Sequence, residues 1–289
     1  MEKTKVKILI STVTSIAALL AIFFFFIPAF QGRIFIPSVI RLGFFSIKLY
    51  GLVLAASILL GYFVARKNSW RFGISSEEID ELSFWLVLVG VVSARIYYIL
   101  FAFDFFSQNP SEIYKIWHGG LSIYGALIGG LGFLVLNSKK KAYSLFQLLD
   151  LIALSLPLSQ ALGRFGNFFN QEAFGTPTNL PWKMYVSEIF RPKGFEQSRF
   201  FHPAFLYESL ASVVIFIILW RLKDRMRSGC VAFAYLGLYS LARFFIESIR
   251  TDSVFVNGFR VDQIIAFFAV MLSAFMINKL LTQEKKQQT

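Results

Sequence analysis

The chain has 289 residues, of which 56% are hydrophobic, 18% aromatic and only 16% charged. Soluble domains carry about 25% charged residues and disordered chains are poorer in apolar residues, so both classes are excluded. A chain this apolar is typical of membrane proteins. Its net charge of +12 therefore indicates basic cytoplasmic loops and contact with anionic membrane lipid, and no nucleic-acid partner is expected.

The first apolar run covers about residues 8–30 and follows three lysines, Lys3, Lys5 and Lys7. A signal peptide is the alternative, but its apolar core would span about 7–15 residues before a small-residue cleavage site. This run is longer, ends in four phenylalanines at 23–26, and contains no Ala-x-Ala. The pattern favours an uncleaved membrane helix.

Seven further apolar runs follow, and a membrane-spanning helix needs about 20 apolar residues. They cover about residues 47–65, 82–106, 119–136, 145–162, 205–219, 231–249 and 261–281. Because proline lacks an N–H group, we expect breaks at Pro157 and Pro203. The sequence therefore predicts an all-α fold, a polytopic transmembrane helix bundle.

The basic residues predict how the bundle is oriented. With the N-terminus inside, every inner loop carries a cluster of lysine or arginine at a helix end, as the positive-inside rule requires. This gives eight spans with both termini in the cytoplasm. We expect an extra helix in 1–34, a membrane core in 35–282 with an extracytoplasmic head segment at 164–201, and a cytoplasmic tail at 283–289.

Several charged residues fall inside the apolar runs, where a charge costs roughly 2.5–3.5 kcal/mol on insertion scales. They are Lys48, Arg95, Asp150, Glu208, Arg243 and Glu247. Such residues usually face a polar cavity and have a partner. Arg243 and Glu247 are four residues apart, so an intrahelical ion pair is one reading. Tyr239 and Arg243 form the other reading, a polar stripe that faces a ligand.

A second polar cluster occupies residues 163–175, where Arg164, Asn167, Asn170 and Glu172 lie among three glycines. Arginine offers a planar fork of donors that fits phosphate, and glycine lets the backbone come close. The alternative is an arginine anchored at lipid headgroups. Both clusters fall at or just below the outer surface, which indicates an anionic lipid headgroup as the ligand.

Two more motifs open membrane spans. His202 precedes Glu208 by about two turns and could simply cap its helix. Gly125 and Gly129 form a Gly-x-x-x-Gly pattern, which by itself indicates only close helix packing. The single cysteine, Cys230, excludes a disulfide framework and a Cys-based zinc site, and the presence of only two histidines argues against a histidine-rich metal site. We therefore expect no metal and no cofactor.

This set of motifs resembles the bacterial prolipoprotein diacylglyceryl transferases. The resemblance rests on residues 163–175, on His202-Pro203 with Tyr207-Glu208, on Trp117 with Tyr124-Gly125, on Tyr50-Gly51, Arg95 and Asp150, and on Arg243, Glu247, Arg250 and Asp252. The chain departs from the family at the helix before residue 35. It departs again at Tyr124, where many members have histidine.

The resemblance implies transfer of the diacylglyceryl group of phosphatidylglycerol to the lipobox cysteine of prolipoproteins in the bacterial cytoplasmic (inner) membrane. It implies catalytic roles for Arg164, Arg243, Tyr50, Tyr124, Glu172 and His202. It implies phosphatidylglycerol-binding roles for Arg164, Asn167, Asn170, Arg243, Arg95, Tyr239 and Glu208. It implies structural or orienting roles for Glu247, Asp150, Gly175 and Arg250, with Glu172 and Glu247 orienting the arginines. The alternatives are a transporter or flippase for an anionic lipid or organic anion, and a non-catalytic lipid-binding protein.

Overall fold

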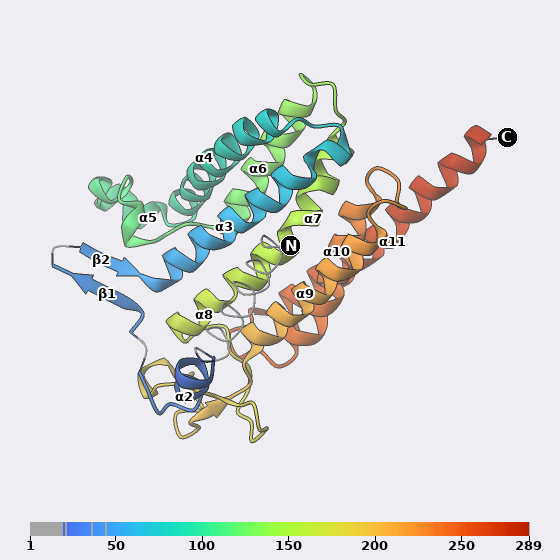
Figure 1. Cartoon of the computed structure of the whole chain (residues 1–289). Coiled ribbons are helices and arrows are strands. Elements are labelled where there is room, and N and C mark those ends of the chain that lie inside the picture. Colours follow the sequence, from blue (N-terminus) through green and yellow to red (C-terminus); the bar gives the residue numbers. More distant parts are fainter. Residues whose placement is uncertain (1–19, 21, 36, 44, 289) are drawn as a thin grey trace, which may run out of the picture. The chain divides into compact units, whose positions relative to one another are not determined.

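The computed structural model describes residues 20, 22–35, 37–43 and 45–288 (Figure 1). Most of the first predicted span, and with it the eight-span count, lies outside these residues. The longer helices are α3 (Leu49–Asn68), α4 (Ser76–Phe101), α6 (Ile123–Ser138), α7 (Leu145–Gly163), α9 (Ala204–Leu222), α10 (Cys230–Glu247) and α11 (Val261–Gln288). The short ones include α2 (Ile27–Phe30), α5 (Phe103–Gln108) and α8 (Phe165–Asn170).

The described part of the chain also contains short 3₁₀ and π-helical turns and three short antiparallel strand pairs. The strand pairs join β1 (Val39–Leu42) with β2 (Phe45–Lys48), β3 (Met184–Tyr185) with β4 (Phe200–Phe201), and β5 (Phe255–Val256) with β6 (Phe259–Arg260). Six of the described helices are long and apolar enough to cross a membrane, and α6 is a shorter apolar helix. These seven helices match the seven predicted runs, so the prediction of an all-α polytopic membrane protein is confirmed.

Helix α4 differs from the predicted run at both ends. It begins at Ser76, before the apolar residues start, because Ser75 caps it: Glu78 N donates to Ser75 Oγ and Ser75 N donates to the Glu78 carboxylate, each at 3.2 Å. This reciprocal capping box satisfies two N–H groups that an uncapped helix would leave unpaired. At its other end, Ala102 leaves the helical conformation and separates α4 from α5.

The predicted break at Pro157 is wrong. Helix α7 continues through the buried Pro157 to Gly163. In membrane helices, neighbouring groups commonly satisfy the carbonyl that a proline leaves free. Pro203 lies directly before α9, so a helix boundary falls at this proline as predicted. Residues 163–175 include the short helix α8, which follows Arg164 directly.

The described chain divides into two compact units, and the division falls within several helices. The first unit comprises the described residues up to Ile58 together with Leu158–Ile215 and Gly237–Met271. Its core is the cluster of Ala29, Phe30, Phe168, Phe174, Met184, Val186, Phe201 and Phe205. The second unit comprises Leu59–Pro157, Phe216–Leu236 and the residues from Leu272 onward.

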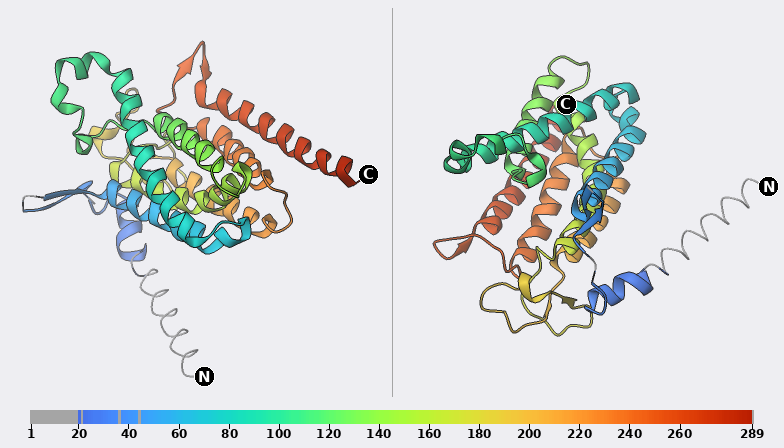
Figure 2. Two further views of the ribbon diagram at one scale, coloured as in Figure 1. Left: turned by 90° about the horizontal axis from the view of Figure 1, so that it is seen from above. Right: turned by 90° about the vertical axis from the view of Figure 1, so that its left-hand side faces the viewer.

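In the second unit, α4 and α6 lie side by side (Figure 2). The contact is close because α6 presents Gly125 and Gly129 to Ser93 and Ala94 of α4. A Cβ added at Gly125 would lie 2.5 Å from the Ser93 carbonyl oxygen and 2.9 Å from the Ala94 Cα. The close packing predicted from Gly-x-x-x-Gly is therefore confirmed.

Candidate functional site

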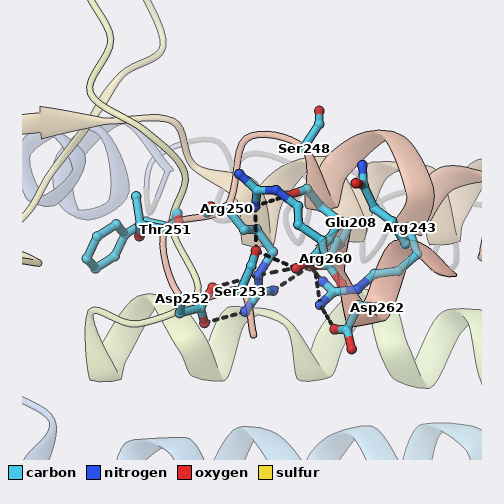
Figure 3. A network of polar contacts seen from close by, with 12 residues as sticks. Glu208, Arg243, Ser248, Arg250, Thr251, Asp252, Ser253, Arg260 and Asp262 are labelled. Carbon is cyan, nitrogen blue, oxygen red and sulfur yellow. Dashed lines mark hydrogen bonds and ion pairs between the residues drawn. The ribbon is translucent and has the colours of Figure 1, made fainter. Parts of the chain in front are cut away.

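Three arginines of the first unit converge on one buried carboxylate, that of Glu208 in α9. The Glu208 side chain is only 2% exposed, and its Oε2 lies 2.5 Å from Nη2 of Arg164. Its Oε1 accepts from Nη1 of Arg243 at 2.8 Å and from Nη1 of Arg250 at 3.0 Å (Figure 3). A buried carboxylate is stable when cations and hydrogen bonds compensate its desolvation, and here three guanidinium groups do so.

Arg243 of α10 is held by three carboxylates. Besides Glu208, its Nη2 lies 2.7 Å from Glu247 Oε2 and donates to Asp262 Oδ2 at 2.7 Å. The intrahelical pair with Glu247 that the four-residue spacing suggests is therefore present, but it is one of three ion pairs. These contacts fix the plane of the Arg243 guanidinium from three sides.

Arg250 and Arg260 connect this cluster to the loop before α11 (Figure 3). Arg250 grips Asp252 with two donors, Nε at 2.9 Å and Nη2 at 2.5 Å. Arg260 Nη1 donates to Ser253 Oγ at 2.5 Å, and Ser253 Oγ donates to Glu247 Oε1 at 2.5 Å. Burial alone would raise the pKa of Asp252, but the Arg250 guanidinium holds that pKa below its ordinary value. Asp252 is therefore ionised at neutral pH.

Arg164 lies between α7 and α8 and has donors to spare. Its Nη2 contacts Glu208 and donates to Tyr239 Oη at 3.0 Å. Its Nε and Nη1 donate to no residue that the structure describes, and its side chain is 24% exposed. Arg164 can thus offer Nε and Nη1, each as a separate donor, to an incoming anion while Glu208 and Tyr239 hold Nη2.

Helix α8 places the two asparagines beside Glu172. The Nδ2 groups of Asn167 and Asn170 donate to Glu172 Oε1 at 3.0 and 3.2 Å. The structure thus places Glu172 with the amides, whereas Glu247 pairs with Arg243. Tyr50 of α3 packs on Gly166, where an added Cβ would lie 2.7 Å from the Tyr50 ring. A side chain at position 166 would push Tyr50 away from α8.

His202 takes part in a chain of hydrogen bonds with Tyr207 and Trp182. Trp182 Nε1 donates to Tyr207 Oη at 2.8 Å, and Tyr207 Oη lies 3.1 Å from His202 Nδ1. The tyrosine oxygen therefore connects the indole of Trp182 to the imidazole ring of His202. Burial lowers the pKa of His202 below its ordinary value, so the ring is neutral at pH 7.

Gly175 lies where three segments meet. Its N–H donates to the His202 carbonyl at 2.8 Å, and it forms an isolated β-bridge with Arg250. A Cβ at this position would lie 2.8 Å from His202 Cβ and 3.0 Å from the Ile249 carbonyl oxygen. The site therefore has no room for a side chain at position 175.

Arg95 belongs to the second unit, where backbone carbonyls surround it. Its Nε donates to Ile113 O at 2.9 Å, and its Nη1 donates to Gly119 O at 2.5 Å and to Gly120 O at 2.9 Å. Its Nη2 donates to the carbonyl of Glu112. All three guanidinium nitrogens therefore donate to backbone carbonyls of this loop. The expected contact of Arg95 with a lipid headgroup stays a prediction.

Asp150 and Tyr124 also belong to the second unit. The Asp150 carboxylate accepts from the backbone N–H groups of Gly229 at 2.6 Å and Ala232 at 2.8 Å. It therefore caps the N-terminus of α10, where an anion is favoured by the helix dipole. Tyr124 opens α6, is 51% exposed, and its ring centroid lies 6.4 Å from that of Tyr97. The catalytic role of Tyr124 stays a prediction.

Sequence reasoning did not single out Asp262, Ser253 or Arg260 as site residues. One signal was available for Asp262, because an acidic residue in the first turn of an apolar helix is worth attention as a partner for a membrane arginine. No local pattern marks Ser253 or Arg260, since both reach the cluster through the fold of the loop before α11.

The amino-acid sequence of the chain is similar to proteins of known name. A family model described as prolipoprotein diacylglyceryl transferase matches residues 37–278. The chain is 43% identical over 278 residues to the phosphatidylglycerol–prolipoprotein diacylglyceryl transferase of Fervidobacterium nodosum, with 95% of each chain covered. It is 43% identical over 256 residues to the protein of that name from Thermotoga maritima, with 87% of each covered. It is 40% identical over 241 residues to that of Synechococcus elongatus, with 81% of this chain and 83% of the relative covered.

The family match covers most of the chain, and residues 37–278 span the positions of the cluster around Glu208. The chain belongs to the prolipoprotein diacylglyceryl transferase family.

Proposed function

We propose that this membrane protein transfers the diacylglyceryl group of phosphatidylglycerol to the cysteine thiol of a prolipoprotein. The observation that carries the proposal is the cluster around Glu208, in which Arg164 keeps Nε and Nη1 free of described partners. A guanidinium that is held in place at Nη2 and keeps N–H donors at Nε and Nη1 is suited to binding a phosphate oxygen. The names of the relatives supply the two substrates.

The chemistry is a displacement at carbon. The sulfur of the lipobox cysteine attacks the glycerol carbon that carries the phosphate, a C–S bond forms, and the C–O bond to the phosphate breaks. The electron pair of that bond leaves with glycerol 1-phosphate, and the thiol proton passes to an acceptor. The phosphate therefore gains negative charge as the bond breaks, and donors aimed at it stabilise the transition state more than the ground state.

The described side chains divide this work. Arg164 binds the phosphate oxygens, and Glu208 and Tyr239 hold Arg164 in place. Arg243, with three carboxylates around it, fixes Glu208 and adds positive potential next to the phosphate. Asn167 and Asn170 shape the headgroup pocket as amide donors. Tyr50 and Tyr124 act as hydrogen-bond or proton-relay groups, because a phenol hydroxyl can both donate and accept a hydrogen bond.

The proposed activity is tested with purified protein, phosphatidylglycerol vesicles and a peptide that contains a lipobox cysteine. We expect release of free glycerol 1-phosphate together with a peptide whose mass has increased by one diacylglyceryl group. A peptide with serine in place of the cysteine is the control and should give neither product. A transporter or a lipid-binding protein would release no glycerol 1-phosphate from either mixture, which would overturn the proposal.

We further propose that the head segment 164–201 faces away from the cytoplasm of the bacterial inner membrane. The basic residues Lys139, Lys140 and Lys141 would then lie in the cytoplasm. Cysteine labelling tests this cleanly, because the native Cys230 is buried. Lys140→Cys and Glu196→Cys place a thiol at an exposed position in each loop.

A membrane-impermeant maleimide added to intact cells, with the outer membrane made permeable where there is one, should label Glu196→Cys. It should label Lys140→Cys only after the inner membrane is opened as well. The unsubstituted protein serves as the background control. The reverse labelling pattern would show that the orientation is inverted.

A further inference from the structure

Four consecutive phenylalanines precede the family region, and the structure divides them into two kinds. Phe23, Phe24 and Phe25 are exposed at 64%, 60% and 65%. Phe26 is half-buried, and Phe30, one turn further along, is 9% exposed. The turn from Phe26 to Phe30 therefore has one side that packs on the protein.

The rings of Phe26 and Phe30 pack on α8 and α9. The Phe26 ring centroid lies 5.7 Å from that of Phe165 and 5.0 Å from that of Phe168. The Phe30 ring centroid lies 5.7 Å from that of Phe168 and 6.1 Å from that of Phe205. These separations are typical of interacting aromatic pairs. We call these five rings the phenylalanine cluster.

A hydrogen-bonded turn follows Phe30 and holds this segment in place. The N–H groups of Gly32 and Arg33 donate to the carbonyls of Ala29 and Pro28, at 3.0 and 2.8 Å. Gly32 has a φ of +71°, and an added Cβ would fall within 2.7 Å of Cδ1 of Tyr185. The turn thus presses against β3 as well as α8, which leaves it little freedom to move away.

The three rings that Phe26 and Phe30 touch flank the central ion pair of the site. Phe165 follows Arg164 directly, and Phe205 lies three residues, nearly one helical turn, before Glu208. Phe165 and Phe205 also contact each other, with ring centroids 5.8 Å apart. Because α8 and α9 meet through this cluster, its packing sets the distance between Arg164 and Glu208.

We propose that Phe26 and Phe30 are positioning residues for phosphatidylglycerol: they hold α8 against α9 so that Arg164, Asn167 and Asn170 keep their places. Both lie outside residues 37–278, which the family model matches. The inference rests on the proposed function, since it names residues that set the affinity of the same site for its lipid.

The test compares Phe30→Ala with Phe24→Ala, which removes the same ring from an exposed position of the same segment. In Phe30→Ala we expect KM for phosphatidylglycerol to rise roughly tenfold. A 1 Å misplacement of catalytic groups can lower the rate ~100-fold, and the loss of one ring from the phenylalanine cluster should shift Arg164 by less than that. KM for the lipobox peptide should stay unchanged. Phe30→Leu, which keeps most of the buried volume, should recover most of the lipid affinity, and Phe24→Ala should behave as the unsubstituted protein.

A purely structural role would lower the amount of active enzyme and so reduce turnover while leaving both KM values unchanged. That result, or an equal rise in KM for Phe24→Ala, would overturn the proposal. If Phe30→Ala does not yield folded protein, Phe26→Ala, which alters the edge of the cluster, replaces it. Phe26→Ala should raise KM for phosphatidylglycerol by a smaller factor, and an unchanged KM in this variant would also overturn the proposal. Absence of turnover in the unsubstituted protein would instead contradict the proposed function.

Discussion

Arg164→Lys is expected to lower kcat/KM for phosphatidylglycerol by about 100- to 1,000-fold, the range seen when one donor to a developing oxyanion is removed. In the native protein, Nη2 of Arg164 serves Glu208 and Tyr239 while Nε and Nη1 remain for the phosphate. A lysine ammonium is a single point charge and cannot hold Glu208 and also present fixed, planar N–H donors to the phosphate. The measurement is steady-state release of glycerol 1-phosphate at varied lipid concentration.

Arg199→Lys is the matched control, because Arg199 is an exposed arginine of the head segment outside the cluster. It should retain nearly full activity.

Arg243→Lys is the companion variant. One ammonium group cannot bind Glu208, Glu247 and Asp262 together, so the variant should lose both turnover and thermal stability. Full turnover in Arg164→Lys would show that the phosphate binds elsewhere.

Glu208→Gln is expected to destabilise the protein by about 3–5 kcal/mol, as removal of one partner from a buried ion pair does. The amide keeps the shape of the carboxylate but removes the negative charge on which Arg164, Arg243 and Arg250 converge. The three guanidinium groups would then repel one another with less compensation. Thermal unfolding in detergent should show a fall in Tm of roughly 10 °C.

Glu81→Gln provides the control for this change. Glu81 is an exposed glutamate of α4 with no ion pair to another described residue. Its substitution should shift Tm by no more than about 1–2 °C, since surface changes stay within about 0.5 kcal/mol. Equal Tm values for the Glu208 and Glu81 variants would show that Glu208 is not the centre of the ion-pair cluster.

The membrane helices were predictable because lipid imposes a simple rule on the backbone. Every N–H and C=O within the bilayer must be satisfied inside the segment, so a long apolar run has to be a helix. The ends were less predictable. The start of α4 depends on the capping box of Ser75 and Glu78, whose residues are polar and fall outside any apolar run. Pro157 misled for a related reason, since its effect depends on which neighbours surround it.

The candidate site was predictable in its residues but not in its contacts. The spacing of Arg243 and Glu247 predicts a shared helix face, and the structure shows their ion pair at 2.7 Å. The spacing of residues along the chain could not predict that three arginines contact Glu208. Arg164 and Arg250 lie 44 and 42 residues away from it in the sequence. Asp262 was missed because only the packing of α11 brings it to Arg243.

The partners of Arg95 could not be predicted from the sequence either. A buried arginine in a membrane helix predicts a polar partner, and a lipid phosphate and a set of loop carbonyls are equally consistent with that rule. The structure gives Arg95 four carbonyls from residues 112–120. Asp150, chosen as an orienting residue, caps α10 through backbone N–H groups about 80 residues away.

The sequence by itself determined the membrane class, the seven apolar helices of the described chain and the identity of the charged residues that could bind an anion. Those properties are local, because hydrophobicity and spacing along one helix are enough to specify them. Only the tertiary structure decided which charges neutralise one another, which donors of Arg164 remain for a ligand, and that Phe26 and Phe30 pack beside them. Pairing between distant side chains depends on how helices pack, and no local pattern encodes that packing.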